Sequence, residues 1–334
     1  MKVDASSAAN TPETETCADP KVGLFSKILV PIDFSEPSDE ALGYALFLAR
    51  ASGAGIHLLN VVEPIPTYSG FQEMPIVFSE TQTAERCREE LAKVADKYRS
   101  ADLSVTSEVT LGPAADGIAA KAGTWPADLI VIATHGYTGL KHVLLGSVAE
   151  KIVRYAPCPV LVIRRKEEKT KGGVETGGHE TPFSVPIQLL VPTDFSPRSV
   201  YALRYAARFA RQIGGQITLV HCVNITPGDA PILQAEYDLS VLTEVCADAA
   251  RRELSQQAAS ECHAAILRDS VILYGAPLAK LPEFARKGHF DLIICATRGY
   301  TGLKHLLLGS TAEGIVRHAP CPVLVVGEKS HAHA

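Results

Sequence analysis

Three features are missing from this chain of 334 residues, and each absence argues against a class of protein. No apolar run approaches the ~18 residues that a membrane-spanning helix needs. No block of basic residues stands out, and 32 basic against 37 acidic residues give a net charge of -5, which disfavours nucleic acid as a partner. The eight cysteines are scattered without a CxxC pair, which favours reduced thiols. We therefore expect a soluble, cytoplasmic protein.

Familiar catalytic motifs are also missing. The sequence has no GxSxG elbow, no Walker GxxxxGK[ST] loop and no carboxylate pair spaced for acid and base work. His135 and His142 lack a nearby cysteine or carboxylate cluster that would complete a metal site. We expect neither catalytic residues nor a bound metal.

The chain does contain an internal repeat. Residues 134–163 and 297–326 align without gaps and are identical at 24 of 30 positions, including GYTGLKH, LLGS and APCPVLV. A second repeat relates IDFSEPSDEALGYALFLA after residue 31 to TDFSPRSVYALRYAARFA after residue 192. The expected organisation is a disordered leader at 1–22, a domain at 23–165, a flexible linker at 166–185, a domain at 186–328 and a tail at 329–334.

Each half alternates β-branched runs with helical patterns, which predicts βαβ units and a parallel sheet covered on both faces. The predicted strands are 27–33, 55–62, 104–111, 128–133 and 159–164, then 187–193, 216–223, 270–274, 291–296 and 322–326. A long helix is expected over 233–261, and serine followed by proline marks helix starts at Ser35 and Ser196. The fold class is α/β, with two tandem Rossmann-like domains whose ligands sit at the carboxyl ends of the strands.

A glycine and serine turn follows the fourth predicted strand. Gly146 and Ser147 come directly before an amphipathic helix, and Ser147 is expected to cap it. The backbone N–H groups of Gly146, Ser147 and Val148, with the positive end of the helix dipole, form a candidate anion site. A plain helix cap is the alternative, but the position of the turn beside the first strand favours a ligand.

Asp33 ends the first strand and faces the same crevice, with Pro31 shaping its wall. Its carboxylate is suited to ribose hydroxyls or an adenine amino group. The alternative is an Asx turn, in which Asp33 accepts backbone N–H groups of its own loop. The two roles are compatible.

These residues resemble the universal stress protein family, and the likeness covers both halves. The ATP-binding members carry Gly, two residues, Gly, nine residues, Gly, then Ser or Thr, which falls here on Ala133, Gly136, Gly146 and Ser147. The resemblance implies the adenine nucleotide alpha hydrolase-like version of the Rossmann fold. It also implies a nucleotide with its base near Asp33 and Val61 and its phosphates at Gly136, Gly146 and Ser147.

The second half repeats the pattern with the same spacing. The matching residues are Pro192, Asp194, Cys222 in the place of Val61, Ala296, Gly299, Gly309, Ser310 and Thr311. Both copies depart from the family at the first motif position, where alanine replaces glycine. If that backbone needs a positive φ or touches phosphate, the methyl group weakens binding, whereas strand-like angles make it harmless.

Other segments allow two interpretations. Cys158 and Cys321 in APCPV are expected to be packed structural thiols, with redox sensing as the alternative. Segment 64–78 is a surface loop or a lid. Strand five of each half is apolar and lies at an expected sheet edge, which favours pairing with another strand. The resemblance implies that the two halves pair through this strand within one chain. A homodimer of whole chains is a further option.

We expect a stress-response sensor or adaptor that binds ATP, with or without Mg²⁺, and is read by a protein partner that the sequence does not identify. The alternatives are a signalling module that binds no nucleotide and a slow ATPase or self-phosphorylating enzyme.

Overall fold

The computed structural model describes residues 23–63, 80–134, 145–164, 182–225, 239–262, 264–297 and 309–327. The first half contains β1 Lys27–Pro31, α1 Glu36–Ser52, β2 Gly55–Val62, α2 Glu80–Tyr98, β3 Val105–Leu111, α3 Ala114–Thr124, β4 Leu129–Ala133, α4 Ser147–Tyr155 and β5 Val160–Ile163. The second half contains β6 Ile187–Pro192, α5 Pro197–Ile213, β7 Gly215–Val223, α6 Leu239–Glu261, β8 Leu267–Tyr274, α7 Pro277–Lys287, β9 Leu292–Ala296, α8 Ser310–His318 and β10 Val323–Val326.

All ten predicted strands are present, so the expected α/β fold is confirmed. The largest difference is β8, which begins at Leu267 and not at residue 270. The long helix of the second half begins at Leu239 in the described part of the chain, and residues 233–238 lie outside it. The predicted leader, most of the linker and the tail also lie outside the described residues.

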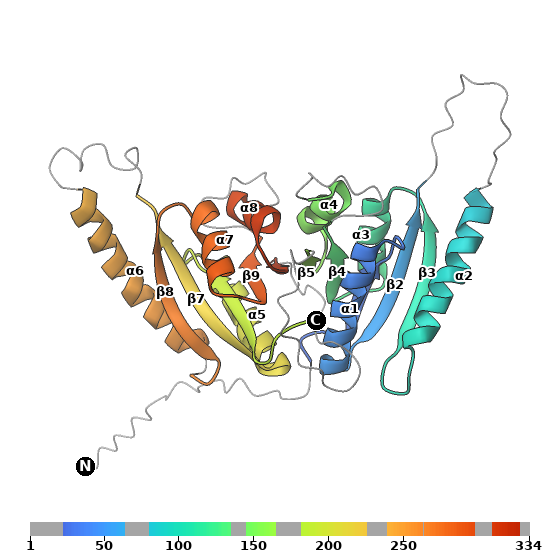
Figure 1. The fold of residues 1–334 in the computed structure, drawn as a ribbon, viewed down its shortest axis with the longest axis horizontal. Helices are drawn as coiled ribbons and strands as arrows, with labels where there is room; N and C mark the ends of the chain where they lie inside the picture. The colour runs from blue at the N-terminus through green and yellow to red at the C-terminus, as the bar shows by residue number, and fades with distance from the viewer. Residues whose placement is uncertain are drawn as a thin grey trace, which may run out of the picture.

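The ten strands form one sheet in the order β3-β2-β1-β4-β5-β10-β9-β6-β7-β8 (Figure 1). Pairing is parallel within each half, whereas β5 and β10 pair antiparallel, with Leu161 opposite Leu324. The predicted pairing of the halves through strand five is therefore confirmed, and the two expected edges close against each other.

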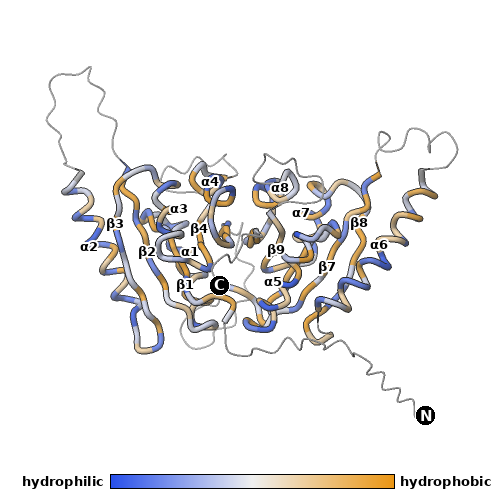
Figure 2. Tube along the Cα trace, turned by 180° about the vertical axis from the view of Figure 1, so that it is seen from behind, coloured by the Kyte–Doolittle hydropathy of each residue, from blue (hydrophilic) through white to orange (hydrophobic). Residues whose placement is uncertain are grey.

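Helices cover both faces of this sheet. One apolar cluster packs α1, α2, α5 and α6 against the strands, and a second packs α3, α4, α7 and α8 against the opposite face. Figure 2 shows the hydrophobic colour concentrated along the strands, while α2 and α6 at the two ends alternate between hydrophilic and hydrophobic. This pattern is typical of a doubly wound sheet with amphipathic outer helices.

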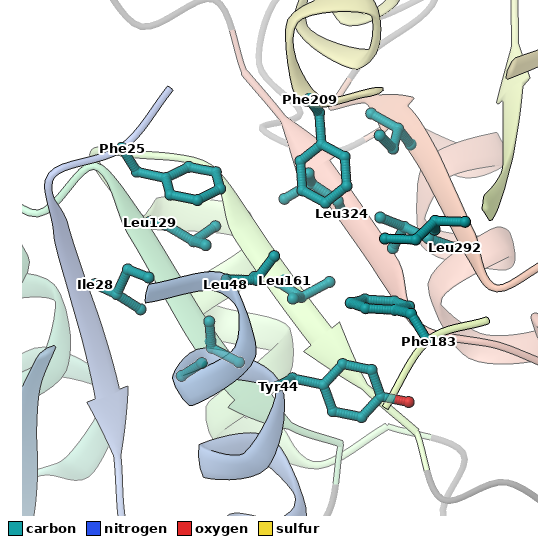
Figure 3. Packing of buried hydrophobic residues seen from close by; sticks show 14 of the residues in the cluster. Phe25, Ile28, Tyr44, Leu48, Leu129, Leu161, Phe183, Phe209, Leu292 and Leu324 are labelled. Carbon is teal, nitrogen blue, oxygen red and sulfur yellow. The ribbon is translucent and has the colours of Figure 1, made fainter. Parts of the chain in front are cut away.

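Aromatic side chains join the halves on the α1 and α5 side. The ring centroids of Phe25 and Phe209, one from each half, are 6.3 Å apart, and Tyr44 meets Phe183, near the end of the predicted linker, edge-on at 5.0 Å (Figure 3). All four rings are buried. Because these contacts lie between segments far apart in sequence, the two halves share part of their core.

Two helix starts follow the predicted serine and proline signal. Ser35 Oγ accepts a hydrogen bond from the N–H of Ser38 at 3.4 Å, and Ser196 Oγ accepts from Ser199 at 3.2 Å. Both caps satisfy a donor of the first helical turn. Because the caps are Ser35 and Ser196, α1 and α5 begin directly after the loops that carry Asp33 and Asp194.

Candidate functional site

A cavity of about 510 Å³ opens at the carboxyl ends of β1, β2 and β4. Strand β1 lies between β2 and β4, so the cavity sits where the winding of the sheet reverses. Seven of the predicted site residues line it together: Pro31, Asp33, Val61, Ala133, Gly146, Ser147 and Val148. Gly136 lies outside the described residues.

Asp33 makes the Asx turn that was one of the two alternatives. Its Oδ1 accepts hydrogen bonds from the N–H of Ser35 at 3.1 Å and from Ser35 Oγ at 2.5 Å. Between them Phe34 adopts a positive φ of 61°, which is uncommon for a residue with a side chain. Asp33 also lines the cavity, so the turn orients its carboxylate without removing it from the site.

Asn60 supports this turn and was not singled out from the sequence. It is buried, and its Nδ2 donates to the carbonyl oxygen of Ile32 at 2.7 Å. The bond ties the end of β1 to β2 directly below Asp33. A polar residue within an apolar strand is the signal that could have identified it.

The glycine and serine turn differs from the prediction in one respect. Gly146 is the N-cap, with φ -69° and ψ 148°, and Ser147 is the first residue of the helix. The prediction that Ser147 caps α4 is therefore wrong, because the extended residue is the glycine.

The same geometry revises the set of anion donors. The N–H of Gly146 donates to the carbonyl of Thr134 at 2.6 Å, so it is already used. The N–H groups of Ser147 and Val148 belong to the first turn of α4, where no intrahelical acceptor exists. These two groups and the helix dipole therefore remain as the candidate donors of the predicted anion site at the cavity.

Ala133 has ordinary strand geometry. It is the last residue of β4, pairs with Ile163 of β5 and is not among the residues with positive φ. The following N–H of Thr134 donates to the carbonyl of Ile163 at 3.0 Å and continues the strand ladder. Glycine is therefore not required for backbone conformation here, and the same holds for Ala296 beside Val326.

Glu63 is a second carboxylate of the cavity that the sequence analysis missed. Its Oε1 accepts from the N–H of Ala114, the first residue of α3, at 2.9 Å. The N-terminus of α3 therefore lies against a carboxylate that follows β2, whereas the acidic side chain in the first turn of α4 is its own Glu150. Its place directly after β2, at the carboxyl edge of the sheet, is the signal that could have identified it.

The second half places its predicted residues at equivalent points of the fold. Pro192 ends β6, Cys222 lies in β7, Ala296 ends β9, and Ser310 and Thr311 begin α8 after the N-cap Gly309. Asp194 Oδ1 accepts from the N–H of Ser196 at 3.1 Å, as Asp33 does from Ser35. Gly299 lies outside the described residues.

The second half differs in the side chains that support its turn. His221 Nδ1 bonds the carbonyl of Thr193 at 2.9 Å, and its ring stacks on Phe195 with centroids 4.3 Å apart. Burial lowers the pKa of His221, opposed by the Thr193 bond and by Asp194. The ring is therefore held neutral more strongly than a free histidine.

A buried polar network further distinguishes the second half. Thr193 Oγ1 lies 3.1 Å from Ser199 Oγ and 3.1 Å from Gln257 Oε1, and it accepts from the N–H of Phe195. Gln257 belongs to α6, so this helix is tied to the turn of the second site. The first half has Ile32 where Thr193 stands, and its turn has no such link through that residue.

The remaining candidates have mixed outcomes. Cys321 is buried as expected, whereas Cys158 is half-buried. His135, His142 and segment 64–78 lie outside the described residues. Within the described ranges, no three histidine, cysteine, aspartate or glutamate side chains are placed to hold a metal ion.

Comparison with known proteins agrees with this architecture. The model of the universal stress protein family matches residues 24–164 and again 188–327. The chain belongs to the universal stress protein family. A universal stress protein of Methanocaldococcus jannaschii is 35% identical over 150 residues, which covers 44% of this chain and 86% of the relative.

Relatives that contain both halves are also found. A universal stress protein of Mycolicibacterium smegmatis is 24% identical over 303 residues, covering 90% of this chain and 96% of the relative. The crystal structure of a universal stress protein from Archaeoglobus fulgidus has a TM-score of 0.62 at 22% identity and covers 91% of this chain and 98% of that one. The tandem arrangement is thus shared across much of both chains. No helix within the described residues is long and apolar enough to cross a membrane.

Proposed function

We propose that this universal stress protein binds ATP-like nucleotides at one site per half and acts as a stress-response sensor or adaptor. One observation carries the proposal. One cavity of about 510 Å³ is lined together by Asp33 at the end of β1, Val61 on β2 and the first residues of α4. Its size is typical of a small-molecule site.

The charges of the cavity favour one orientation of the ligand. Asp33 and Glu63 lie on the β1, β2 and α3 side, where they repel phosphate and accept hydrogen bonds from hydroxyl or amino groups. Ser147 and Val148 present N–H groups at the positive end of α4. The base and ribose therefore bind beside Asp33 and Val61, and the phosphates bind at α4.

The alanine of the motif is compatible with this arrangement. Ala133 lines the cavity with strand-like backbone, so its methyl group adds apolar wall next to Ile132 without strain. This supports nucleotide binding over the alternative of a module without a ligand. Mg²⁺ accompanies the phosphates in the proposed complex when it is present in solution.

A sensor agrees with the cavity better than an enzyme does. Its described lining residues include no histidine or cysteine, and each of its two carboxylates accepts a backbone N–H, Asp33 from Ser35 and Glu63 from Ala114. Occupancy would instead change the surface around the start of α4, and a protein partner reads that change. The cytoplasm is the proposed location, and the free thiols of the seven described cysteines agree with a reducing compartment.

Mass spectrometry of protein purified without added nucleotide, together with calorimetry against ATP, tests the proposal. We expect up to two nucleotides per chain and a large loss of binding at the first site in Gly146→Val. The N-cap φ of -69° accepts a β-branched residue, so this variant blocks the phosphate turn without backbone strain. Absence of ligand together with absence of binding heat would contradict the proposal. Phosphate release that disappears in Asp33→Asn would favour the ATPase alternative.

A further inference from the structure

Helices α4 and α8 begin at the two glycine and serine turns, Gly146–Ser147 and Gly309–Ser310, which we call the phosphate turns. The two helices meet each other across the centre of the molecule. Figure 1 shows them on either side of the junction between β5 and β10. Four side chains bridge them: Glu150 and Arg154 from α4, and Glu313 and Arg317 from α8. We call these four residues the charge ring.

Each arginine of the charge ring contacts both glutamates. Arg317 Nη2 lies 2.9 Å from Glu313 and 3.2 Å from Glu150 of the other half. Arg154 Nη2 lies 3.1 Å from Glu150 and 3.9 Å from Glu313. The ring is therefore closed, and two of its four contacts cross between the halves.

The charge ring is partly shielded from water. Its four side chains are between 29% and 36% exposed, so their interactions are screened less than those of fully exposed pairs. The Nε atoms of Arg154 and Arg317 are buried and have no hydrogen-bond partner among the described residues. The contacts given above between each guanidinium and the two glutamates share the same Nη2 atom, so the guanidinium is able to shift between them.

The ring is joined directly to both phosphate turns. The N–H of Glu150 donates to the carbonyl of Gly146 at 2.9 Å, and that of Glu313 donates to Gly309 at 2.9 Å. Each glutamate therefore sits one helical turn, about 5.4 Å along the axis, from the N-terminus where a phosphate would bind. A charge placed at either turn acts on the nearest glutamate.

We propose that the charge ring couples the two nucleotide sites, so that a nucleotide bound in one half lowers the affinity of the other half. This inference rests on the proposed function and assigns its regulation. In this proposal the four residues of the charge ring are positioning residues: they act on the bound nucleotides through the helix starts and do not contact the nucleotides.

The sign of the coupling follows from electrostatics. Phosphate at the first turn of α4 repels the Glu150 carboxylate, which moves closer to Arg317. Arg317 then neutralises Glu313 less well, so the start of α8 becomes more negative and holds a second phosphate less tightly. When the second half binds first, the corresponding effects pass from Glu313 through Arg154 to Glu150 and weaken the first site.

Calorimetry with ATP on the full chain separates coupling from an intrinsic difference between the sites. Gly309→Val leaves only the first site and Gly146→Val leaves only the second, and neither variant adds a charge that would mimic phosphate. Without coupling, the product of the two stepwise association constants of the wild type equals the product of the two single-site constants. We expect the wild-type product to be lower by about fivefold, at the small end of allosteric couplings.

Variants of the charge ring test whether it carries the effect. In Glu150→Gln/Glu313→Gln, with and without each blocking variant, we expect the two products to become equal. Arg317→Gln provides an independent break of the cross-half contact, and circular dichroism reports whether each variant folds. The matched control is Glu90→Gln on α2, which loses an exposed ion pair with Lys93 and should keep the fivefold difference.

Each remaining outcome is decisive. Equal products in the wild type would overturn the coupling, as would a difference that persists in every variant of the ring. Binding of one nucleotide to the wild type with no second event would also overturn it. If the wild type binds no ATP at all, the proposed function fails, whereas two independent nucleotides leave that function intact and remove only this inference.

Discussion

Asn60 and His221 hold equivalent positions in β2 and β7 and make the same contact with different chemistry. Asn60 Nδ2 donates to the carbonyl of Ile32 at 2.7 Å, and His221 Nδ1 donates to the carbonyl of Thr193 at 2.9 Å. Each acceptor comes one residue before the aspartate of its site. Both bonds therefore hold the turn that orients that aspartate.

Asn60→Ala should weaken both stability and the first site. The substitution leaves the carbonyl of Ile32 buried without its donor, which costs about 1–3 kcal/mol of unfolding free energy. Urea unfolding measures the loss, and ATP titration in the Gly309→Val background measures the first site. The matched control is Asn60→His, which places the donor of the second half at this position and should restore much of the affinity. Equal affinity in Asn60→Ala and the wild type would show that the bond does not orient Asp33.

His221→Asn should flatten the dependence of stability on pH. Burial lowers the pKa of His221 from its ordinary value of 6.5, so below that pH the unfolded chain binds a proton that the folded chain does not. The contribution of neutral His221 to the free energy of unfolding is therefore complete above about pH 6.5 and is lost as the pH falls toward the lower pKa of the folded state. Asparagine keeps the hydrogen bond to Thr193 and does not titrate.

The measurement is the unfolding temperature of both proteins between about pH 5 and pH 7.5. His57 contributes in the same direction, because burial and the nearby Lys121 lower its pKa, with Glu108 opposing them. Part of the slope should therefore remain in His221→Asn. Curves that run parallel over the whole range would contradict the assignment.

Phe209→Ala should destabilise the chain by about 3–5 kcal/mol, because it removes a fully buried ring from the core shared by the halves. Its contact with Phe25 of the first half is lost at the same time. We expect the unfolding transition of the variant to be broader than that of the wild type, or split, as the halves become less dependent on each other. Leu111→Ala, at a side chain that is 55% exposed, is the control and should change stability by about 0.5 kcal/mol or less.

Much of the fold was predictable because local signals repeat. Alternating β-branched runs predicted all ten strands. The apolar character of strand five predicted an edge open to pairing, and the family resemblance implied that the halves pair through it, as β5 and β10 do. The end of a helix or strand depends on hydrogen bonds that the pattern does not encode. This is why β8 starts at Leu267 and why Gly146, not Ser147, caps α4.

The site was predicted less completely, because several of its residues act on partners that are far away along the chain. Pro31, Asp33 and Ser147 carry recognisable turn signals, and the structure brings them to one cavity. Asn60 and Glu63 act through contacts with Ile32 and Ala114, which become neighbours only when the sheet forms. The charge ring likewise depends on the antiparallel register of β5 and β10, which neither half contains alone.

Cysteine reactivity should follow burial and not position in the motif. Burial raises the pKa of Cys295 to about 12 and that of Cys222 to about 11, so both thiols are far from ionised at neutral pH. Cys246 is exposed on α6. Mass spectrometry after brief iodoacetamide treatment of the folded protein should find Cys246 modified well before the other two. Early modification of Cys222 would show that the wall of the second site opens in solution.

Ala133→Gly tests whether the departure from the family motif matters. Ala133 ends β4 with strand geometry, paired with Ile163, so glycine relieves no strain there. Added backbone freedom should instead lower stability by roughly 0.5–1 kcal/mol, while ATP affinity of the first site changes by no more than about threefold. Ala296→Gly at the same point of the second half is the companion variant and should behave alike. A gain in affinity of about tenfold or more, equivalent to ~1.4 kcal/mol, would mean that the methyl group of Ala133 presses on the phosphates. The first motif position would then control how tightly each half holds its nucleotide.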